Sequence, residues 1–329
     1  MLLTLYFSII YDNIQGTNMR KQLRKIFISN QYAIKVDLNS KFIIVTGASE
    51  KSIGFETAKT LAQWGAQVII TTRSNTQATI KKMQLKTNNI DGYDLDLTQR
   101  KSVINFALWY EKKYNNQLDV LINNAGIHLD LLSQWKNPNL SHDGHEIHWR
   151  TNYLGTFHLT QLLLPLLQYT GGKKGNARII NITSKLHEKG NNINLFEPLE
   201  PYNSWTAYGL SKLALIHMTN ELQTKYSESS NIQSFSLHPG SVFSNIATKG
   251  LEGNAFIEKV RNLLSPIEAF FLLTPYEGSQ TSIHCATEPI LKGGGYYINC
   301  KEHPPHKNST DMSISKKLWR ETIKWFEEQ

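Results

Sequence analysis

The stretch FIIVTGASEKSIGFETAKTLAQW, residues 42–64, joins a short apolar run to a helical pattern through a turn that contains glycine. We interpret residues 42–46 as a buried strand, because the run is almost continuously apolar and rich in β-branched side chains. A turn of this kind suits a pyrophosphate, since unpaired N–H groups and the helix dipole point toward it. The turn alone is a weak signal, because the three closely spaced glycines of the dinucleotide fingerprint are absent. A purely structural turn is the alternative.

The alternation of apolar runs and helical patterns continues along the chain. Further strands are predicted at 67–72, 91–97, 118–123, 177–183, 232–238 and 296–299. Helices are predicted at 53–64, 99–114, 144–168, 207–226 and 276–286. Such an order predicts an α/β fold of the doubly wound Rossmann type, with a mainly parallel, seven-stranded sheet and helices on both faces. Ligands bind these sheets outside the carboxyl ends of the strands, so we expect the site residues directly after strands.

Composition and charge fit one α/β domain. The chain has 329 residues, 40% of them hydrophobic, which is enough for a sizeable core. The net charge of +8 is mostly scattered, so we interpret it as a solvated basic surface with a share for an anionic cofactor, and expect no nucleic-acid partner. Cys285 and Cys300 fit neither a metal spacing nor a disulfide framework, which favours a reducing compartment.

Residues 1–39 precede the predicted domain, which spans residues 40–329. The apolar start, residues 1–10, is too short to span a bilayer and lacks the charge and cleavage pattern of a secretory signal. The segment from Met19 onward mixes basic with apolar residues, as peripheral membrane anchors do. We therefore interpret residues 1–39 as a leader that is either disordered or a peripheral anchor. We expect a cytoplasmic location, membrane-associated in the second case.

The second predicted strand ends in Thr71-Thr72-Arg73. In NAD-binding sheets an acid about 20 residues beyond the glycine turn binds the adenosine ribose 2′-hydroxyl. An arginine at that place suits a 2′-phosphate instead, so Arg73 favours NADP(H) over NAD(H). Lys51, in the first loop, could reinforce this preference. The alternative is an exposed arginine that binds nothing.

The spacing Tyr-x-x-x-Lys occurs three times, at Tyr169/Lys173, Tyr208/Lys212 and Tyr297/Lys301. Tyr169 precedes Gly171-Gly172, where a helix is expected to end, and Tyr297 lies in the last predicted strand. Only Tyr208 and Lys212 fall in the first turns of a predicted helix, where residues four apart share a face. A neighbouring ammonium stabilises a phenolate and lowers the phenol pKa, as a proton donor at neutral pH requires.

Two further segments directly follow predicted strands. Asn124-Ala125-Gly126 comes after the fourth strand, where small and amide residues let the backbone approach a cofactor, unless this is an ordinary Asn-rich turn. Ser184 comes after the fifth strand and could hydrogen-bond a substrate oxygen. By contrast, the trio His142, His145 and His148 does not share one helix face and has no carboxylate or cysteine to complete a metal site, so no metal is predicted.

These segments stand in the order and approximate spacing of a known family. Thr46–Gly54, Asn123–Gly126, Ser184, the pair Tyr208/Lys212 and His238-Pro239-Gly240 together resemble the short-chain dehydrogenase/reductases, over residues 41–329. A closer similarity is to the branch that holds the retinol dehydrogenases and the WW-domain oxidoreductase. The residues that carry it include Ile53–Ala58, Asn152–Gly155, Tyr208–Ala214 and Glu277–Ser282.

The resemblance implies an NADP(H)-dependent oxidoreductase that interconverts a carbonyl and an alcohol. Tyr208 would be the acid/base, Lys212 would hold the nicotinamide ribose, Ser184 would polarise the carbonyl, and Asn152 would anchor a water relay to Lys212. Asp96 matches the position that contacts adenine. The full set of implied cofactor-binding residues is Thr46, Gly47, Ser49, Lys51, Ser52, Ile53, Gly54, Arg73, Asp96, Leu97, Asn124, Ala125, Gly126, Tyr208, Lys212, Pro239 and Gly240.

The resemblance also implies a substrate lid over about residues 241–275. Its apolar stretch 266–273 suits a retinoid-, lipid- or steroid-like substrate, although a core helix would look the same. We therefore expect a small apolar carbonyl or alcohol as the partner and leave a homodimer open.

One departure concerns the first loop. The family has a glycine just before Ile53-Gly54, whereas this chain has Ser52 in a loop that is one residue longer. The side chain would either crowd the pyrophosphate or force a different turn. A catalytically weak, dinucleotide-sensing or interaction protein on the same fold is therefore the alternative function.

Overall fold

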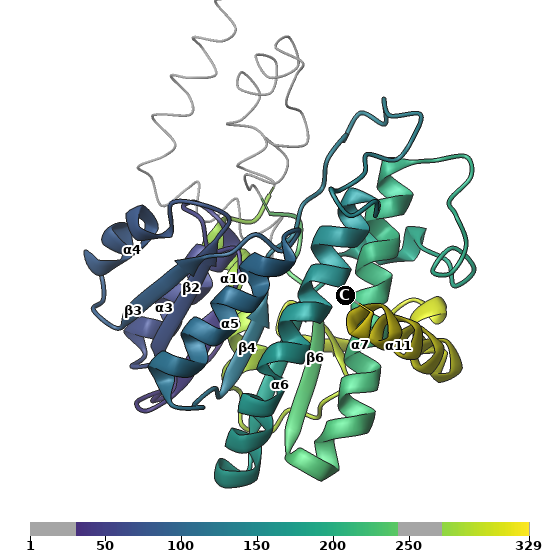
Figure 1. Ribbon diagram of the computed structural model, residues 1–329. Helices are drawn as coiled ribbons and strands as arrows, with labels where there is room; N and C mark the ends of the chain where they lie inside the picture. The colour runs from purple at the N-terminus through teal and green to yellow at the C-terminus, as the bar shows by residue number, and fades with distance from the viewer. Residues whose placement is uncertain (1–30, 243–271, 329) are drawn as a thin grey trace, which may run out of the picture.

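The strands run across the sheet in the order β3-β2-β1-β4-β5-β6-β7-β8 in the computed structural model, which describes residues 31–242 and 272–328 (Figure 1). Strands β1 to β7 are parallel, and the order reverses between β1 and β4. This is the doubly wound α/β arrangement that the sequence predicts. The strands are β1 Phe42–Val45, β2 Gln67–Thr72, β3 Ile90–Asp94, β4 Val120–Asn123, β5 Ala177–Ile182, β6 Ile232–His238, β7 Tyr296–Ile298 and β8 Lys301–His303.

The eighth strand corrects the predicted count of seven. β8 pairs antiparallel with β7 across the two-residue turn Asn299-Cys300, and both turn residues adopt left-handed backbone angles, with φ of 51° and 58°. Turns with positive φ at both central positions match the twist of a hairpin. The segment Lys301–His303 is polar and exposed, so it lacks the apolar pattern of a buried strand.

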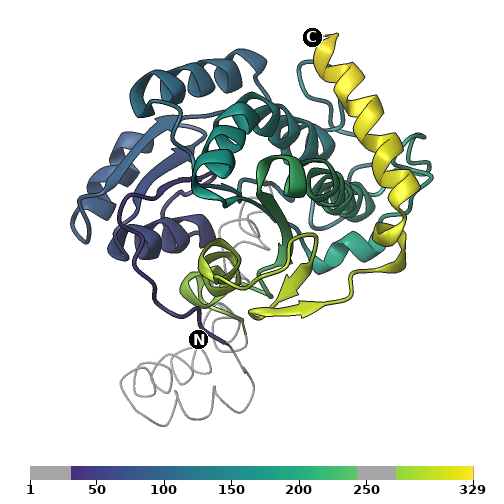
Figure 2. The ribbon, with the colours of Figure 1, turned by 90° about the horizontal axis from the view of Figure 1, so that it is seen from below.

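Helices cover both faces of the sheet (Figure 2). Buried side chains of α3, α4 and α10 pack on one face, and those of α5, α6 and α7 pack on the other. Helix α11 lies against α7 on its outer side, as Figure 1 shows. The helices are α3 Ile53–Gln63, α4 Thr76–Gln84, α5 Arg100–Tyr114, α6 Gly155–Lys174, α7 Ser204–Ser230, α10 Pro275–Thr287 and α11 Met312–Glu327.

Helix α6 differs from the predicted 144–168. The segment around Gly144, which has a φ of 80°, forms a turn, and the helical path begins at residue 147 and continues through the π-helical segment η1, Trp149–Leu154. At its other end α6 continues through Gly171-Gly172 to Lys174. Glycine is only a modest penalty in a helix, and here the missing side chain of Gly171 lets the backbone of Ser230 approach closely.

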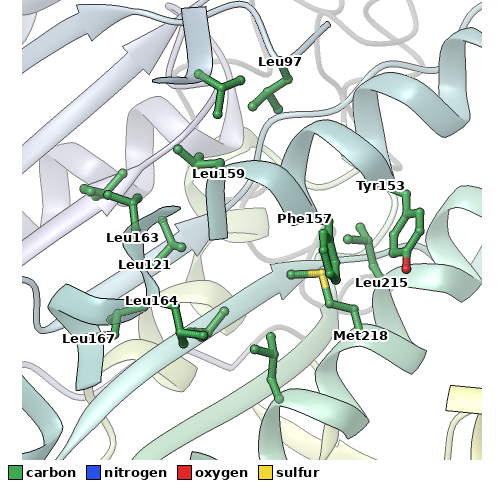
Figure 3. Close-up of a cluster of buried hydrophobic side chains, with 14 of the residues drawn as sticks. Leu97, Leu121, Tyr153, Phe157, Leu159, Leu163, Leu164, Leu167, Leu215 and Met218 are labelled. Carbon is green, nitrogen blue, oxygen red and sulfur yellow. The ribbon is translucent and has the colours of Figure 1, made fainter. Parts of the chain in front are cut away.

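The larger part of the core lies between the sheet and α5, α6 and α7. Figure 3 shows side chains of α6 and α7, including Phe157, Leu163 and Met218, packed with Leu121 of β4. All four are buried. A dense apolar layer of this kind fixes the helices against the sheet, so the residues at the strand ends keep fixed relative positions.

The predicted leader, residues 1–39, and the predicted substrate lid, about residues 241–275, are described only in part. Of the predicted leader, residues 31–39 run along α3 and α10, where Leu38 is buried and its N–H donates to Trp64 O at 2.9 Å. Of the predicted lid, both ends are described, and Leu273 N donates to Ser241 O at 2.8 Å. The rest, residues 1–30 and 243–271 with the apolar stretch 266–271, lies outside the described residues. Within the described part of the chain, none of the helices combines the length and apolar composition that a membrane crossing demands.

Docking of α11 should carry a measurable share of the stability. Trp319 is buried against Phe157 with ring centroids 5.1 Å apart. We expect Trp319→Ala to lower the free energy of unfolding by about 3–5 kcal/mol, as the removal of a large buried ring usually does. Urea denaturation measures the change. Leu108→Ala, at an exposed position of α5, is the control and should stay within about 0.5 kcal/mol of the parent. Equal losses in both variants would contradict the assignment.

Candidate active site

Two turns meet where the strand order reverses, one after β1 and one after β4. The Thr46 hydroxyl accepts hydrogen bonds from Asn124 N at 3.0 Å and Ala125 N at 2.9 Å. In return, the Asn124 amide donates to Thr46 O at 2.7 Å and Gly47 O at 3.1 Å. The predicted cofactor residues of the two turns therefore form one unit at the edge where such sheets bind ligands.

Gly47 and Gly54 are required for these turns to approach each other. Gly47 has a φ of +67°, and a Cβ atom there would lie 2.7 Å from the Cα of Ala125. A Cβ atom on Gly54 would lie 2.4 Å from the Asn124 Nδ2. A backbone cradle without side chains, at the start of a helix, is what a pyrophosphate needs, so the residues present fit a dinucleotide.

The longer first loop forms a different turn, one of the two expected consequences of Ser52. The Ser52 Oγ accepts from Phe55 N at 3.0 Å and so caps α3. The extra residue, Lys51, adopts a left-handed backbone with a φ of 62°. Both Lys51 and Ser49 are exposed on the rim of the turn, whereas Ile53 is buried beneath it.

The edge of the sheet at β2 and β3 holds the residues predicted for the adenosine end. Arg73 is exposed directly after β2. The carboxylate of Asp94 at the end of β3 accepts from Thr76 N at 2.8 Å and Asn75 N at 3.2 Å, which helps to hold its pKa below the usual value against the effect of burial. Asp96 accepts from Thr98 N at 2.9 Å through one carboxylate oxygen. The neighbouring Leu97 is buried.

Tyr208 and Ser184 come together from α7 and the end of β5. Asn203 caps α7, so Tyr208 lies in the second turn of the helix and is only 8% exposed. Burial raises the pKa of Tyr208 to about 12, and a hydrogen bond with the Ser184 side chain acts in the opposite direction. Ser184 is held in turn by His187, whose Nδ1 lies 2.7 Å from Ser184 O. The phenol is therefore protonated and bonded to the predicted carbonyl-polarising residue.

Lys212 lies one turn further along α7 on the same face. Its Nζ donates to Ile182 O at 3.0 Å and lies 5.6 Å from the ring centroid of Tyr208. Burial lowers the pKa of Lys212 to about 8. A Cβ atom on Gly126 would lie 3.2 Å from this Nζ, so the glycine leaves the ammonium accessible from the β4 turn. From the sequence we expected Lys212 to lower the pKa of Tyr208. In the structure the pKa is raised, because burial of the phenol is the larger effect.

Asn152 lies in the π-helical segment η1, and its side chain ties three parts of the site together. Its Oδ1 accepts from Ile127 N at 2.8 Å, and its Nδ2 donates to Ile127 O and Ser211 Oγ, each at 3.0 Å. Ser211 in turn donates to Tyr208 O at 2.7 Å. π-Helical turns recur at functional sites, where they redirect a side chain out of the regular helix. The proposed water relay through Asn152 stays a prediction.

The other two Tyr-x-x-x-Lys matches lie away from this cluster. Tyr169 and Lys173 share a face of α6, contrary to the prediction that the helix ends before them, and the Lys173 ammonium bonds the Tyr169 hydroxyl. Tyr169 is nevertheless 43% exposed. Tyr297 lies in β7, as predicted, and its hydroxyl donates to Lys292 O at 3.3 Å. Helical spacing is thus not unique to Tyr208, but its burial beside Ser184 is not shared by Tyr169.

His128 escaped the sequence reasoning, and His148 was considered there only as a member of the histidine trio. His128 stacks on the ring of Tyr208, with centroids 4.0 Å apart and ring planes 10° apart. His148 is buried, with its Nδ1 2.7 Å from a Glu146 carboxylate oxygen and its Nε2 accepting from Leu129 N at 2.9 Å. The position of His128, directly after a cofactor-binding turn, was the only available signal, and it says nothing about ring contacts. In residues 31–242 and 272–328, no group of three or more His, Cys, Asp or Glu is placed to hold a metal ion.

The last predicted cofactor residues, Pro239 and Gly240, follow β6. Gly240 has a φ of +84°, and a Cβ atom there would lie 2.4 Å from the Cδ1 of Leu273. The two ends of the predicted lid therefore close together beside the carboxyl end of β6, with Val242 and Leu273 joined by a parallel β-bridge.

Comparison with known proteins shows the same family along most of the chain. Residues 41–254 match the family described as short chain dehydrogenase. The chain is 34% identical to human retinol dehydrogenase 11, over 91% of this chain and 89% of that protein. It is 32% identical to a chloroplastic short-chain dehydrogenase of Brassica napus, TIC 32 B, over 96% and 98%.

Solved structures agree on the fold. A protein of Mycobacterium paratuberculosis superposes with a TM-score of 0.67 at 26% identity, covering 91% of this chain and 98% of that one. A short chain dehydrogenase of Shigella flexneri, solved with NADP, superposes with a TM-score of 0.60 at 22% identity, covering 82% and 100%.

The requirement for glycine at position 47 can be tested against a matched glycine. Gly144 also has a positive φ, of +80°, but no heavy atom lies within 4 Å of a Cβ built there. We expect Gly144→Ala to cost only the left-handed strain, about 1–2 kcal/mol. Gly47→Ala should lose about 1–3 kcal/mol more through the clash with Ala125, and should abolish dinucleotide binding. Urea denaturation and nucleotide fluorescence titration measure both effects. Equal behaviour of the two variants would contradict the role of Gly47.

Proposed function

The chain belongs to the short-chain dehydrogenase family, and from that membership we propose an NADP(H)-dependent reductase or dehydrogenase of apolar carbonyls and alcohols. As a member of the family it is an NAD(P)-dependent oxidoreductase that interconverts a carbonyl and an alcohol. The proposal adds the preference for NADP(H), the apolar substrate and the roles of the site residues.

The observation that carries the proposal is the convergence of three side chains at the carboxyl edge of the sheet. Tyr208, Lys212 and Ser184 come from two elements and lie beside the β4 turn at Gly126. The nicotinamide ring supplies or accepts the hydride when it is bound. The chain's own task is then to bind the substrate oxygen and to move one proton.

Each residue has a role that follows from its surroundings. The Tyr208 hydroxyl donates its proton to the substrate oxygen in reduction and takes it back in oxidation. The Ser184 hydroxyl, bonded to that phenol, holds the substrate oxygen in place. Lys212, whose pKa burial lowers to about 8, holds the ribose and stabilises the phenolate that forms. A positioned acid of this kind contributes about 10²–10⁴-fold to the rate.

The preference for NADP(H) is supported at the end of β2. Residues 71–75 contain no carboxylate, and Arg73 is exposed there. The carboxylate at the end of the adjacent strand, Asp94, is engaged by the N–H groups of Asn75 and Thr76. A guanidinium without a competing acid favours the 2′-phosphate of NADP(H) over a free hydroxyl.

The apolar substrate is supported by the relatives and by the surroundings of the phenol. Retinol dehydrogenases 11, 12 and 14 are named for an apolar alcohol, and they match this chain at 31–35% identity. On the protein, the His128 ring stacks on Tyr208 with centroids 4.0 Å apart, and the Trp205 ring lies edge-on to His128 at 4.9 Å. We further propose a peripheral membrane contact through residues 1–30, because their basic and apolar composition suits one.

The cofactor preference can be tested at Arg73. We expect Arg73→Asp to weaken NADPH binding about 10- to 100-fold, because a charged hydrogen bond to phosphate is worth about 1.5–3 kcal/mol. NADH binding should change little. Fluorescence titration with both nucleotides measures the ratio, and Arg320→Asp, at a highly exposed arginine of α11, is the control. Equal or tighter NADH binding by the parent protein would remove the NADP(H) preference.

The catalytic role can be tested at Tyr208. Tyr208→Phe removes the hydroxyl and keeps the ring, so folding and NADPH binding should survive while turnover of an active aldehyde falls by about 10²–10⁴-fold. Steady-state kinetics over a series of aldehydes and alcohols of rising chain length measures this and the substrate class together.

Two other variants serve as controls for the same experiment. Tyr169→Phe and Tyr297→Phe remove the hydroxyls of the other two Tyr-x-x-x-Lys matches and should leave turnover unchanged. A large loss of turnover in either variant would assign the acid/base role to that tyrosine instead of Tyr208. Unchanged turnover in Tyr208→Phe would refute the proposed mechanism. If the parent protein bound nucleotide but turned over none of the substrates, a dinucleotide-sensing role would replace the enzymatic one.

A further inference from the structure

One face of the Tyr208 ring is covered by another ring. The imidazole of His128 lies parallel to the phenol, with centroids 4.0 Å apart and planes 10° apart. Trp205 meets the imidazole edge-on at 4.9 Å, and His148 meets the phenol edge-on at 6.1 Å. Offset-parallel and edge-on contacts of this kind are the favourable arrangements of aromatic rings.

The backbone on both sides of His128 is fixed by side-chain hydrogen bonds. Asn152 bonds both the N–H and the C=O of Ile127. On the other side, Leu129 N donates to the Nε2 of His148 at 2.9 Å. His148 is in turn bonded through its Nδ1 to Glu146, which also accepts from the Tyr202 hydroxyl at 3.1 Å. Few loop residues are held from both neighbours, so this one has a defined position against α7.

Trp205 adds a third restraint. Its Nε1 donates to Leu131 O at 3.1 Å, and the adjacent Ser204 donates to Asp130 O at 2.9 Å. The first turn of α7 therefore binds the same loop that carries His128. The stack between His128 and Tyr208 is a further contact between this loop and α7.

The geometry separates two possible roles for His128. The lone pair and the N–H of an imidazole lie in the plane of its ring, so a ring stacked face to face on a phenol cannot direct either of them at that phenol. The Nε2 of His128 is buried and has no hydrogen-bond partner among residues 31–242 and 272–328, and the residue is 6% exposed. A proton relay from Tyr208 through His128 is thus disfavoured, whereas van der Waals support of the phenol ring is what the stack provides.

The charge state of His128 agrees with a supporting role. Burial lowers its pKa to about 3, and electrostatic interactions with His148 and Lys212 act in the same direction, while Asp130 opposes them. The imidazole therefore stays neutral across the range in which the enzyme works. In the described part of the chain, the phenol of Tyr208 is faced by Ser184, Lys212, His128 and His148.

We propose that His128 is a positioning residue for Tyr208. The flat imidazole ring holds the phenol toward Ser184 and excludes water from one face of the phenol. The inference depends on the proposed function, because it assigns His128 to the acid/base step at Tyr208. Stacking restricts the torsion that swings the hydroxyl, and a displacement of about 1 Å at a reacting group can cost about 100-fold in rate. Exclusion of water also keeps the phenol pKa high, since burial is the main cause of its rise.

The test compares a variant without the ring with one that keeps it. His128→Ala should lower kcat about 10- to 100-fold, leave the Kd for NADPH unchanged, and shift the apparent pKa of alcohol oxidation downward. The direction follows because water would reach the phenol, whose pKa would fall from about 12 toward its free value of about 10. His128→Phe keeps a flat ring and should retain kcat within about threefold, with an unchanged pH profile. His128→Met fills the volume without a flat ring. It should lower kcat as His128→Ala does, but it keeps water from the phenol, so the pH profile should stay unchanged. It also serves as the test of positioning if the cavity in His128→Ala prevents folding.

A matched control and a measurement without turnover make the test decisive. His158, on α6, is equally buried and packs edge-on against Phe326 at 5.3 Å, so His158→Ala should lower stability and leave the pH profile unchanged. The phenolate absorbance of each variant, with the Tyr208→Phe titration subtracted, reports the Tyr208 pKa directly. If His128→Phe lost as much activity as His128→Ala, a nitrogen of the imidazole would be needed and the proposal would be overturned. Unchanged kcat and pKa in both His128→Ala and His128→Met would also overturn it. A parent protein without turnover would refute the proposed function, while the absorbance titration would still decide the role of His128.

Discussion

The hydrogen bonds between Thr46 and the Asn124 segment are the constraint on which the rest of the site depends. They join the turn after β1 to the turn after β4 at the point where the strand order reverses. Gly47 must then pack against Ala125 without a side chain. The same turn leads directly into α3. Because the β4 turn is held in this way, the loop that leaves it begins at a fixed place. That loop reaches α7 within a few residues, where His128 stacks on Tyr208.

From this junction the architecture extends through buried polar side chains. Asn152, in a π-helical turn, bonds Ile127 on the loop and Ser211 on α7, and Ser211 bonds the backbone of Tyr208. Buried polar groups are costly unless they are paired, so a network with paired members specifies one arrangement of the elements that carry them. The apolar layer under α6 and α7 supplies most of the stability. The amide and hydroxyl groups select the register in which the helices meet the sheet.

Two opposing effects determine the chemistry of the phenol. Burial raises the pKa of Tyr208, and a neighbouring ammonium would lower it. At Tyr208 burial dominates, and the effect that acts against it is the hydrogen bond with Ser184, while the Lys212 Nζ lies 5.6 Å from the ring centroid and donates to Ile182 O. The same burial lowers the pKa values of Lys212 and His128. At neutral pH the phenol of Tyr208 and the imidazole of His128 are therefore neutral, while Lys212, with a pKa of about 8, still carries most of its charge.

The sequence by itself determined the α/β class, the order of the seven parallel strands along the chain, the family and the places where site residues follow strands. These features are local, because apolar periodicity and short motifs report what lies within a few residues. The tertiary structure decided what depends on contacts between distant segments. It extended α6 past Gly171-Gly172 through close packing on Ser230, added β8 through a hairpin turn, and brought His128 onto Tyr208. The spacing of Tyr169 and Lys173 equals that of Tyr208 and Lys212, yet only packing beside Ser184 distinguishes the second pair. No local pattern encodes that difference, since it arises from the burial and the neighbours that the fold supplies.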